Sequence, residues 1–449
     1  MSVRANQPEP QDQSERSSNL RVLPQPAPKP RVVVVGGGFG GLNVVRELAN
    51  KDVEVLVLDR NNYHGFWPLL YQIATAALLA DSIGYPIREV THRYPNTRFQ
   101  MAEVERVDLE NKQVITDGGP VSYDYLVMAA GSINNFFGNQ TIKHNVYSLK
   151  DIDEALELRD GLLEAFEEAS RETDPQRKKE LMTFVIVGAG PTGVELAGAF
   201  ADLICPLITK SYPALNSKDI RIVLVEAHNS MLEIFPKTLQ DKAQKDLEKM
   251  GVEILPFSPV VSVDKGCVTF KDGRTLKAGT VVWAAGVKAS ELAKCLEVEL
   301  KQSGRVPVQP TLNLEKHPEV YVIGDMAYLQ DYKNGKEAYP MVAPVAIQMA
   351  KRASRNILAQ VQGKPLKKFK YLDKGNMATI GRSKAVVDAF GISMDGWFAW
   401  IVWLLVHLFF LIGYRNRFLV ILSWAYDYIT YNRGIRLLGG RRDGRRVVV

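Results

Sequence analysis

Two glycine-rich turns constrain the fold of this chain more than any other feature of its sequence. The first lies in "RVVVVGGGFGGLNVVRELA" from Arg31, and the second in "FVIVGAGPTGVELAGAFA" from Phe184. Each turn follows a run of β-branched residues and precedes a helical pattern, which predicts a strand, a tight turn and a helix. A chain that repeats this unit after about 150 residues is expected to hold two phosphate-bearing ligands.

The first turn has the spacing Gly36-x-Gly38-x-x-Gly41, and Asp59 ends the next hydrophobic run. The first glycine allows the bend, the second lets backbone amides approach a pyrophosphate, and the third lets helix and strand pack closely. An acid placed like Asp59 can accept hydrogen bonds from an adenosine ribose. The strand, helix and acid together disfavour a glycine turn that binds nothing. The expected binding residues are Gly36, Gly38, Phe39, Gly40, Gly41, Asp59 and Arg60.

The second turn repeats this context as Gly188-x-Gly190-x-x-Gly193, with Glu226 at the end of "IRIVLVE". A carboxylate at this place repels the 2′-phosphate of NADPH, and no arginine follows in "AHNS" to receive one. We therefore expect a preference for NADH, although His228 can partly compensate.

Composition and cysteine placement narrow the class of protein. A chain of 449 residues with 46% hydrophobic content predicts more than one domain, and the alternation of strand and helix patterns predicts an α/β fold. Cys205, Cys267 and Cys295 form no CxxC pair, so we expect neither a disulfide framework nor a zinc site. Flavoprotein disulfide reductases are disfavoured because they need a dithiol. Six histidines without HxxxH or HExxH spacing predict no metal.

The C-terminal region is apolar and then basic. The 16 residues from Trp397 to Ile412 contain one polar side chain, His407, and span roughly 24 Å as a helix, short of the roughly 30 Å of a bilayer core. A second apolar segment, "FLVILSWAYDYI", begins at Phe418. Two such helices suit a monotopic anchor in one leaflet, while a core helix or a homodimer contact stays open. We expect His407 to be a partnered histidine and not a ligand.

Charge placement favours a lipid partner. Eight arginines against two aspartates lie between Gly413 and Val449, an excess equal to the net charge of +6 of the whole chain. A basic segment beside apolar helices is expected to bind an anionic bilayer surface and not nucleic acid. No apolar secretory signal precedes the first strand, so the catalytic body is expected where it is synthesised.

The order of motifs resembles the two-dinucleotide-domain flavoproteins, the superfamily that includes the pyridine nucleotide-disulfide oxidoreductases. "AAG" occurs at Ala129–Gly131 and Ala284–Gly286, and "VYVIGDMA" contains Asp325. In that family the GD aspartate binds the ribityl or pyrophosphate part of FAD. The resemblance implies FAD at the first turn and NADH at the second, in two Rossmann-like domains, the second inserted in the first. It adds Gly131, Asp325 and Gly286 to the expected cofactor-binding residues.

Within that family, "LDRNNYHGFWPLLYQIATAAL" and "APVAIQ" resemble type II NADH:quinone oxidoreductases. This implies hydride transfer from NADH to FAD and two electrons to a membrane quinone in respiratory electron transport, without proton pumping. Gln348 matches the second glutamine of an AQxAxQ motif, and Pro344 replaces the first. Glu195 and Gln348 are the expected catalytic residues. The alternatives are a helix-start acid for Glu195 and an ordinary polar helix position for Gln348. The apolar run Phe66 to Leu70 is expected to shield the flavin, line a quinone tunnel or pack in the core.

These observations predict a domain order. Residues 1–30 are expected to be a disordered lead, 31–150 and 306–390 the FAD-binding domain, 151–305 the NADH-binding domain, 391–435 membrane-anchoring helices and 436–449 a basic tail. The expected location is the cytoplasmic face of the cell inner membrane, with an organellar inner membrane open. Three alternative functions remain: a soluble flavin reductase that donates electrons to a small redox protein, a sulfide:quinone oxidoreductase, and a nucleotide-sensing interaction protein. The second of these would need suitably placed cysteines.

Overall fold

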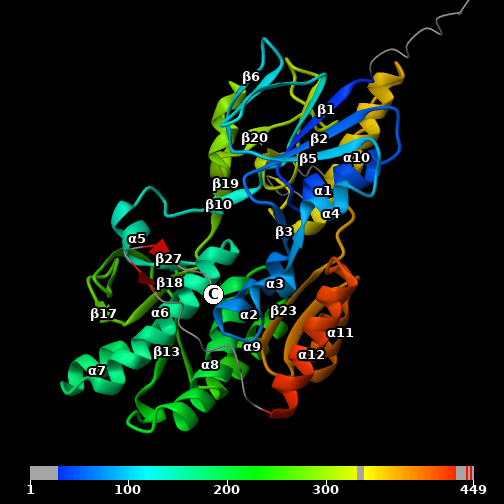
Figure 1. Cartoon of the computed structure of the whole chain (residues 1–449). Coiled ribbons are helices and arrows are strands. Elements are labelled where there is room, and N and C mark those ends of the chain that lie inside the picture. The colour runs from blue at the N-terminus through cyan, green and yellow to red at the C-terminus, as the bar shows by residue number, and fades with distance from the viewer. Residues whose placement is uncertain (1–28, 331–337, 431–440, 443–444, 447–449) are drawn as a thin grey trace, which may run out of the picture.

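The computed structural model shows two α/β units with a pair of C-terminal helices beside the second (Figure 1). It describes residues 29–330, 338–430, 441–442 and 445–446, without the side chains of 205–210. The lead expected over 1–30 therefore lies outside the described residues except for its last two. The basic tail over 436–449 likewise lies outside them, apart from the short pair β26 (Arg441–Arg442) and β27 (Arg445–Arg446).

The first unit is built on a parallel sheet of order β21-β9-β1-β2-β5. Its strands are β1 (Arg31–Val35), β2 (Glu54–Asp59), β5 (Thr97–Met101), β9 (Tyr125–Met128) and β21 (Val320–Val322). The valines of β1 are buried because a parallel strand is covered on both faces. Helix α1 (Phe39–Leu48) follows β1 and packs against α10 (Ala343–Val361).

The second unit repeats this architecture with the parallel order β11-β18-β12-β13-β14. Its strands are β11 (Tyr147–Ser148), β12 (Thr183–Val187), β13 (Arg221–Val225), β14 (Val252–Leu255) and β18 (Thr280–Trp283). The principal helices are α6 (Ile152–Arg171), α8 (Pro191–Ser211) and α9 (Lys237–Lys249). Because β21 joins the first sheet only after the second sheet is complete, the second unit is an insertion in the first.

The chain crosses between the units twice, and the two crossings pair with each other. Strand β10 (Ser132–Asn134) runs antiparallel to β19 (Val287–Ala289), so the segments that follow the two "AAG" sequences lie side by side. Because the pairing is antiparallel, Ser132 lies opposite Ala289 and Asn134 lies opposite Val287, so the end of β9 and the end of β18 lie at opposite ends of this two-stranded crossing.

Shorter elements complete the two units. Three-stranded antiparallel sheets are formed by β6 (Val104–Asp108), β7 (Gln113–Thr116) and β8 (Gly119–Ser122), and by β15 (Val260–Asp264), β16 (Cys267–Phe270) and β17 (Thr275–Lys277). Two-residue strands β20 (Val306–Pro307) and β22 (Ala327–Tyr328) pair in parallel. The segment after β2 forms β3 (Tyr63–Gly65), η1 (Trp67–Leu69), α2 (Leu70–Ala74), α3 (Ala80–Ile83), β4 (Gly84–Pro86) and α4 (Ile87–Thr91). The other helices are α5 (Gln140–Asn145), α7 (Pro175–Leu181), η2 (Ser217–Asp219), η3 (Glu291–Leu296), η4 (Gln302–Gly304) and η5 (Gly324–Met326).

The C-terminal part joins the second unit. An antiparallel sheet is formed by β23 (Asn376–Gly381), β24 (Lys384–Ala389) and β25 (Ile392–Asp395), and it packs on α8 and α9. The sequence pattern predicts instead that residues up to 390 belong to the first unit. Contact between α8 and β23 is close, because a Cβ on Gly198 would lie 2.0 Å from the carbonyl oxygen of Ile380. Phe166, Phe184 and Trp403 consequently belong to one hydrophobic core.

The two apolar segments near the C-terminus form α11 (Gly396–Phe410) and α12 (Tyr414–Thr430), which lie beside β23 and β24 (Figure 1). Only Ala399 and Trp403 of α11 are buried, and only Asn416 and Val420 of α12. Across the helices that the structure describes, none combines the length and apolarity needed to cross a bilayer.

Candidate functional site

In the first glycine turn, there is space for a ligand beside Gly38, whereas Gly36 and Gly41 are packed against the backbone. Gly36 has a left-handed φ of +106°, and a Cβ there would lie 2.4 Å from the carbonyl oxygen of Ala129. A Cβ on Gly41 would lie 1.8 Å from the carbonyl oxygen of Gly36. A Cβ on Gly38 would meet nothing within 4 Å. The fold itself therefore requires the outer glycines, and the space beside Gly38 fits a pyrophosphate at the start of α1.

The acid after this turn is held against it. Asp59 Oδ2 accepts a hydrogen bond from the amide of Gly37 at 2.6 Å, and Oδ1 accepts one from the amide of Asn61 at 2.8 Å. Burial raises the pKa of Asp59, and these two amides oppose the rise. Arg60 is exposed beside it.

Two further predicted residues of this turn face its interior. Phe39 begins α1 and meets the rings of His64 and Phe66 edge-on, at centroid distances of 5.0 and 5.9 Å. Gly40 approaches Ile323, whose Cδ1 would lie 3.2 Å from an added Cβ. Both residues therefore pack against other protein residues next to the turn.

The second turn reproduces this geometry. Gly188 has a φ of +105°, and a Cβ on Gly193 would lie 1.9 Å from the carbonyl oxygen of Gly188, while Gly190 faces open space. Glu226 Oε2 accepts a hydrogen bond from the amide of Ala189 at 2.8 Å, and Oε1 accepts one from the amide of His228 at 3.0 Å. Each dinucleotide turn thus carries one acid fixed to the backbone beside its open glycine.

The remaining predicted cofactor residues lie at the two ends of the crossing strands, with Gly131 opposite Ser290 and Gly286 opposite Asn135. Gly131 and Gly286 both have left-handed φ values, +67° and +124°, at the points where the chain leaves each sheet. Ser132, which follows Gly131, donates a hydrogen bond from Oγ to Asp325 Oδ2 at 2.5 Å. The GD aspartate is therefore tied to the end of β9 and lies at the edge where the first turn opens.

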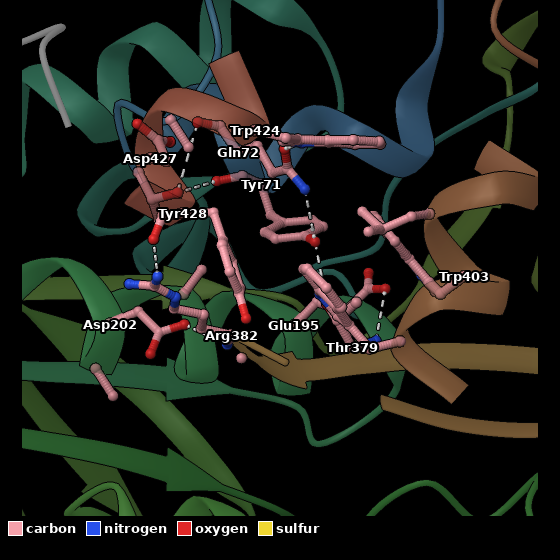
Figure 2. A pocket seen from close by; sticks show the side chains of 17 residues that line it. Tyr71, Gln72, Glu195, Asp202, Thr379, Arg382, Trp403, Trp424, Asp427 and Tyr428 are labelled. Atoms are coloured by element: carbon pink, nitrogen blue, oxygen red, sulfur yellow. Dashed lines mark hydrogen bonds between the residues drawn. The ribbon is translucent and has the colours of Figure 1, made fainter. Parts of the chain in front are cut away.

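A cavity of about 340 Å³ lies between the second unit and the C-terminal helices (Figure 2). Its walls come from α2, α8, β23, α11 and α12, segments far apart in the sequence. The lining residues are Tyr71, Gln72, Thr75, Ala77, Glu195, Ala199, Ala201, Asp202, Thr379, Gly381, Arg382, Trp400, Trp403, Leu404, Trp424, Asp427 and Tyr428. Five aromatic side chains, from α2, α11 and α12, together with a few polar groups in one cavity are typical of a site for a flat organic ligand.

Glu195 is a buried acid in the wall of this cavity. It lies in the first turns of α8, and its Oε1 accepts a hydrogen bond of 3.4 Å from the amide of Thr379. Burial raises the pKa of Glu195 to about 8. The Trp403 indole lies beside the carboxyl and offsets part of this rise, although its Nε1 makes no hydrogen bond of normal geometry within the described residues. The carboxyl is therefore mostly protonated at neutral pH.

A chain of hydrogen bonds joins three walls of the cavity (Figure 2). Trp424 Nε1 donates to Gln72 Oε1 at 2.7 Å, and Gln72 Nε2 donates to the Tyr71 hydroxyl at 3.0 Å. The Tyr71 hydroxyl lies 3.0 Å from the hydroxyl of Thr379. This chain fixes α12 and β23 against α2, so the shape of the cavity depends on all three.

The opposite end of the cavity is charged. The amide of Arg382 donates to Asp202 Oδ2 at 2.6 Å, and its guanidinium lies 4.4 Å from the ring centre of Tyr428 and donates to the Tyr428 carbonyl oxygen. Asp427 lines the same end. One side of the hollow is thus aromatic and the other is ionic.

The structure separates the two predicted catalytic residues. Gln348 lies on α10 and does not line the cavity; its amide donates to the Leu372 carbonyl oxygen at 2.9 Å and accepts from the Leu372 amide at 3.0 Å. Only Glu195 faces the hollow. Five lining residues were not predicted from the sequence: Tyr71, Gln72, Thr379, Arg382 and Trp424. Tyr71 and Gln72 nevertheless belong to the segment "LDRNNYHGFWPLLYQIATAAL", which carries the resemblance to the type II enzymes.

The apolar run before Tyr71 packs in the core. Phe66, Leu69 and Leu70 are buried and do not line the cavity. His407 stacks on Trp403 with ring centres 3.8 Å apart, and its Nδ1 lies 2.8 Å from the Trp403 carbonyl oxygen. Burial lowers the pKa of His407 to about 4, so this histidine is neutral and partnered.

Comparison with known proteins identifies the family. Residues 30–350 match the pyridine nucleotide-disulphide oxidoreductase family, and residues 374–431 match the NDH2 C-terminal domain. The chain is 38% identical over 425 residues to the type II NADH:quinone oxidoreductase Ndh of Mycobacterium tuberculosis, covering 91% of this chain and 90% of that one. This chain belongs to the type II NADH:quinone oxidoreductases.

Solved structures share the fold. The structure of NDH2 from Plasmodium falciparum in complex with NADH aligns with a TM-score of 0.82 at 22% identity, over 90% of this chain and 99% of that one. The sulfide:quinone oxidoreductase of Aquifex aeolicus aligns with a TM-score of 0.71 at 18% identity, over 89% and 95%. At such identities the likeness concerns the fold alone, and it is the sequence relationship that places the chain among the type II NADH:quinone oxidoreductases and makes it an oxidoreductase.

Proposed function

We propose that this chain transfers hydride from NADH to FAD and then passes two electrons to a membrane quinone, without pumping protons. Membership of the type II NADH:quinone oxidoreductases and the two complete dinucleotide turns support this function. The observation that carries it is the cavity beside Glu195, because its aromatic walls and hydroxyl donors suit a quinone ring.

The residues of the first unit fit FAD. Gly38 and its neighbouring amides offer space for the pyrophosphate, Asp59 lies where an adenosine ribose would bind, and Asp325 would hold the ribityl part. FAD supplies the hydride-accepting and electron-transferring chemistry when it is bound. The protein contributes the orientation of donor and acceptor.

The second unit fits NADH. Gly190 offers the same open space, and Glu226 carries its charge where the 2′-phosphate of NADPH would lie. The crossing strands β10 and β19 join the two units, and in this proposal FAD binds on one side of that crossing and NADH on the other.

The cavity residues would orient a quinone headgroup and supply a proton. One of the hydroxyls of Tyr71 and Thr379 donates to the other, so at most one hydroxyl proton of this pair is directed to a quinone. The carboxyl of Glu195 holds a proton at neutral pH because its pKa is about 8. Reduction of a quinone to a quinol consumes protons, so a protonated acid at this place serves the reaction. Gln348 enters this proposal only as a support for the segment at Leu372.

The C-terminal helices are proposed to lie in one leaflet of the membrane, at its cytoplasmic face. Phe398 and Phe409 of α11 are 74% and 71% exposed, and Tyr414 and Phe418 of α12 are exposed as well. Arg415 is exposed among them and is suited to anionic headgroups, while the guanidinium of Arg417 donates to the carbonyl oxygens of Leu411 and Phe409. Because α11 and α12 also form one wall of the cavity, a quinone in the bilayer would reach it from this side.

Anaerobic stopped-flow absorbance tests the function. NADH is mixed with the FAD-loaded protein, the flavin absorbance is followed, and a short-chain quinone is then added. We expect rapid bleaching by NADH, slower bleaching by NADPH, and recovery of the absorbance with quinone. For Tyr71→Phe combined with Trp424→Phe, we expect normal bleaching and recovery at least tenfold slower.

Two of the alternative functions, the flavin reductase and the nucleotide-sensing protein, have distinct outcomes in this experiment. A flavin that NADH reduces and quinone leaves reduced would indicate a small redox protein as acceptor. Binding of both dinucleotides without any bleaching would indicate a nucleotide-sensing protein.

A further inference from the structure

A cluster of charged and polar side chains lies where the chain crosses from the first unit to the second. Lys150 Nζ donates a hydrogen bond to Ser132 Oγ at 2.8 Å, and Ser132 Oγ donates to Asp325 Oδ2 at 2.5 Å. Ser132 is buried, and Lys150 and Asp325 are half-buried. A lysine from the segment before α6 is thus linked through one hydroxyl to the GD aspartate of the first unit.

The same lysine is fixed on the side of the second unit. The amide of Lys150 donates to Glu154 Oε2 at 2.7 Å, and Asn134 Nδ2 donates to both oxygens of Glu154, at 2.9 and 3.1 Å. Asp151 caps α6 by accepting from the amide of Glu154 at 2.9 Å. The backbone at Lys150 therefore has one defined position relative to β10.

The direction of the hydrogen bonds matters. A serine hydroxyl has a single proton, and since Ser132 Oγ accepts from the ammonium, that proton is directed to Asp325. Oδ2 of Asp325 is the oxygen that is engaged, which leaves Oδ1 for a ligand hydroxyl. A lysine that only joined α6 to the first unit would be expected to pair its ammonium with Glu154. Glu154 instead accepts from the backbone amide of Lys150, and the ammonium donates to Ser132.

Charges around Lys150 agree with a fixed cation. Burial lowers the pKa of Lys150, and the carboxylates of Asp325, Glu154 and Asp151 oppose this lowering. The guanidinium of Arg305, which donates to the carbonyl oxygens of Ala327 and Tyr339, also interacts electrostatically with Asp325. Removing Lys150 would leave three acids beside the crossing strands with one cation fewer to balance them.

We propose that Lys150 is a positioning residue for FAD, which acts through Ser132 to orient the Asp325 carboxylate toward the cofactor and to balance its charge. This inference rests on the proposed function, in which Asp325 holds the ribityl part of FAD. Two consequences follow. Loss of Lys150 weakens FAD binding, and since reduction adds electrons to the cofactor, loss of a nearby cation makes that reduction harder.

The test measures FAD release and flavin midpoint potential in the holoenzyme. The variants are Lys150→Met, Lys150→Arg and Ser132→Ala, with Lys143→Met as control because Lys143 is an exposed lysine on α5. For Lys150→Met we expect an FAD dissociation constant raised at least roughly tenfold and a lower midpoint potential. Lys150→Arg should restore most of the potential, and Ser132→Ala should weaken FAD binding while keeping the cation. Lys143→Met should match the wild type.

The outcomes separate this inference from the proposed function. Wild-type FAD affinity and potential in Lys150→Met would overturn the inference, whatever the quinone activity. If Lys150→Met does not accumulate as folded protein, wild-type FAD affinity in Ser132→Ala would overturn it instead. Altered FAD affinity in these variants together with no quinone reduction by the wild-type holoenzyme would sustain the inference and reject the proposed function.

Discussion

Tyr71 and Thr379 lie 308 residues apart in the sequence, and their hydroxyl oxygens are 3.0 Å apart across the cavity. Tyr71 comes from the short helix after the first ribose acid, and Thr379 from the first strand of the C-terminal sheet. Thr379 also donates its amide to Glu195. One residue pair therefore ties the first unit, the second unit and the C-terminal part together at the proposed quinone site.

In the first glycine turn, an alanine at position 41 is expected to disturb folding, whereas an alanine at position 38 is expected to disturb FAD binding. Gly41→Ala places a methyl group against the backbone of Gly36 and should destabilise the fold by about 3 kcal/mol or more. Gly38→Ala meets open space at φ −73° and should fold normally, within about 1 kcal/mol of the wild type, but lose FAD. Thermal unfolding and flavin content measure the two effects. A Gly38→Ala protein that retains FAD like the wild type would contradict the pyrophosphate assignment.

Glu226 is expected to set the preference for NADH. In Glu226→Gln the side chain keeps its shape but no longer repels the 2′-phosphate, so kcat/KM for NADPH relative to NADH should rise about tenfold, or ~1.4 kcal/mol. Glu233→Gln, which changes an exposed acid after the same strand, is the control and should leave the ratio unchanged. An unchanged ratio in Glu226→Gln would show that discrimination lies elsewhere in the second unit.

Burial of Glu195 makes stability depend on pH in a predictable direction. Its pKa is about 8 in the folded protein against an ordinary value of 4.5, so the folded state binds the proton more tightly than the unfolded state. Stability should fall as pH rises from about 4.5 through about 8, and Glu195→Gln should remove this loss. From these two pKa values, we expect the stability of the variant relative to the wild type to be about 4 kcal/mol higher at pH 9 than at pH 5. Thermal unfolding at both pH values measures this; equal effects would refute the burial argument.

The same titration should appear in the kinetics. Reoxidation of the reduced flavin by quinone should slow above pH 8 in the wild type, because Glu195 then loses its proton. In Glu195→Gln the rate should be lower, and this pH dependence should be absent. Flavin bleaching by NADH serves as the internal control in both proteins.

The apolar surface of α11 predicts lipid binding. Phe398→Glu combined with Phe409→Glu should reduce binding to anionic vesicles at least 100-fold, since burying each phenylalanine contributes about 1.5–3 kcal/mol. Activity with a water-soluble short-chain quinone should stay near the wild-type value. Met101→Glu, an exposed apolar position on β5, is the matched control. If the double variant still binds vesicles but changes its oligomeric state in sedimentation, the face is a contact between two copies of this chain.

Much of this architecture is readable from local sequence. Both glycine turns, the acids after them and the α/β alternation depend on spacing over short distances, because a strand, a tight turn and a helix are each determined by neighbouring residues. The order of the motifs along the chain further indicated FAD at the first turn and NADH at the second. Helices at α6, α10 and α11 also follow directly from their apolar periodicity or apolar length.

Tertiary structure decided which distant residues share a site. No local pattern could show that Gln348 binds the Leu372 backbone while Glu195 meets Thr379 and Trp403, because these contacts depend on how β23 and α11 pack on α8. Nor could spacing reveal that Lys150 reaches Asp325 through Ser132. Residue type and spacing determined the two dinucleotide turns, whereas side chains brought together over hundreds of residues formed the cavity, since burial and hydrogen bonding act through space and not along the chain.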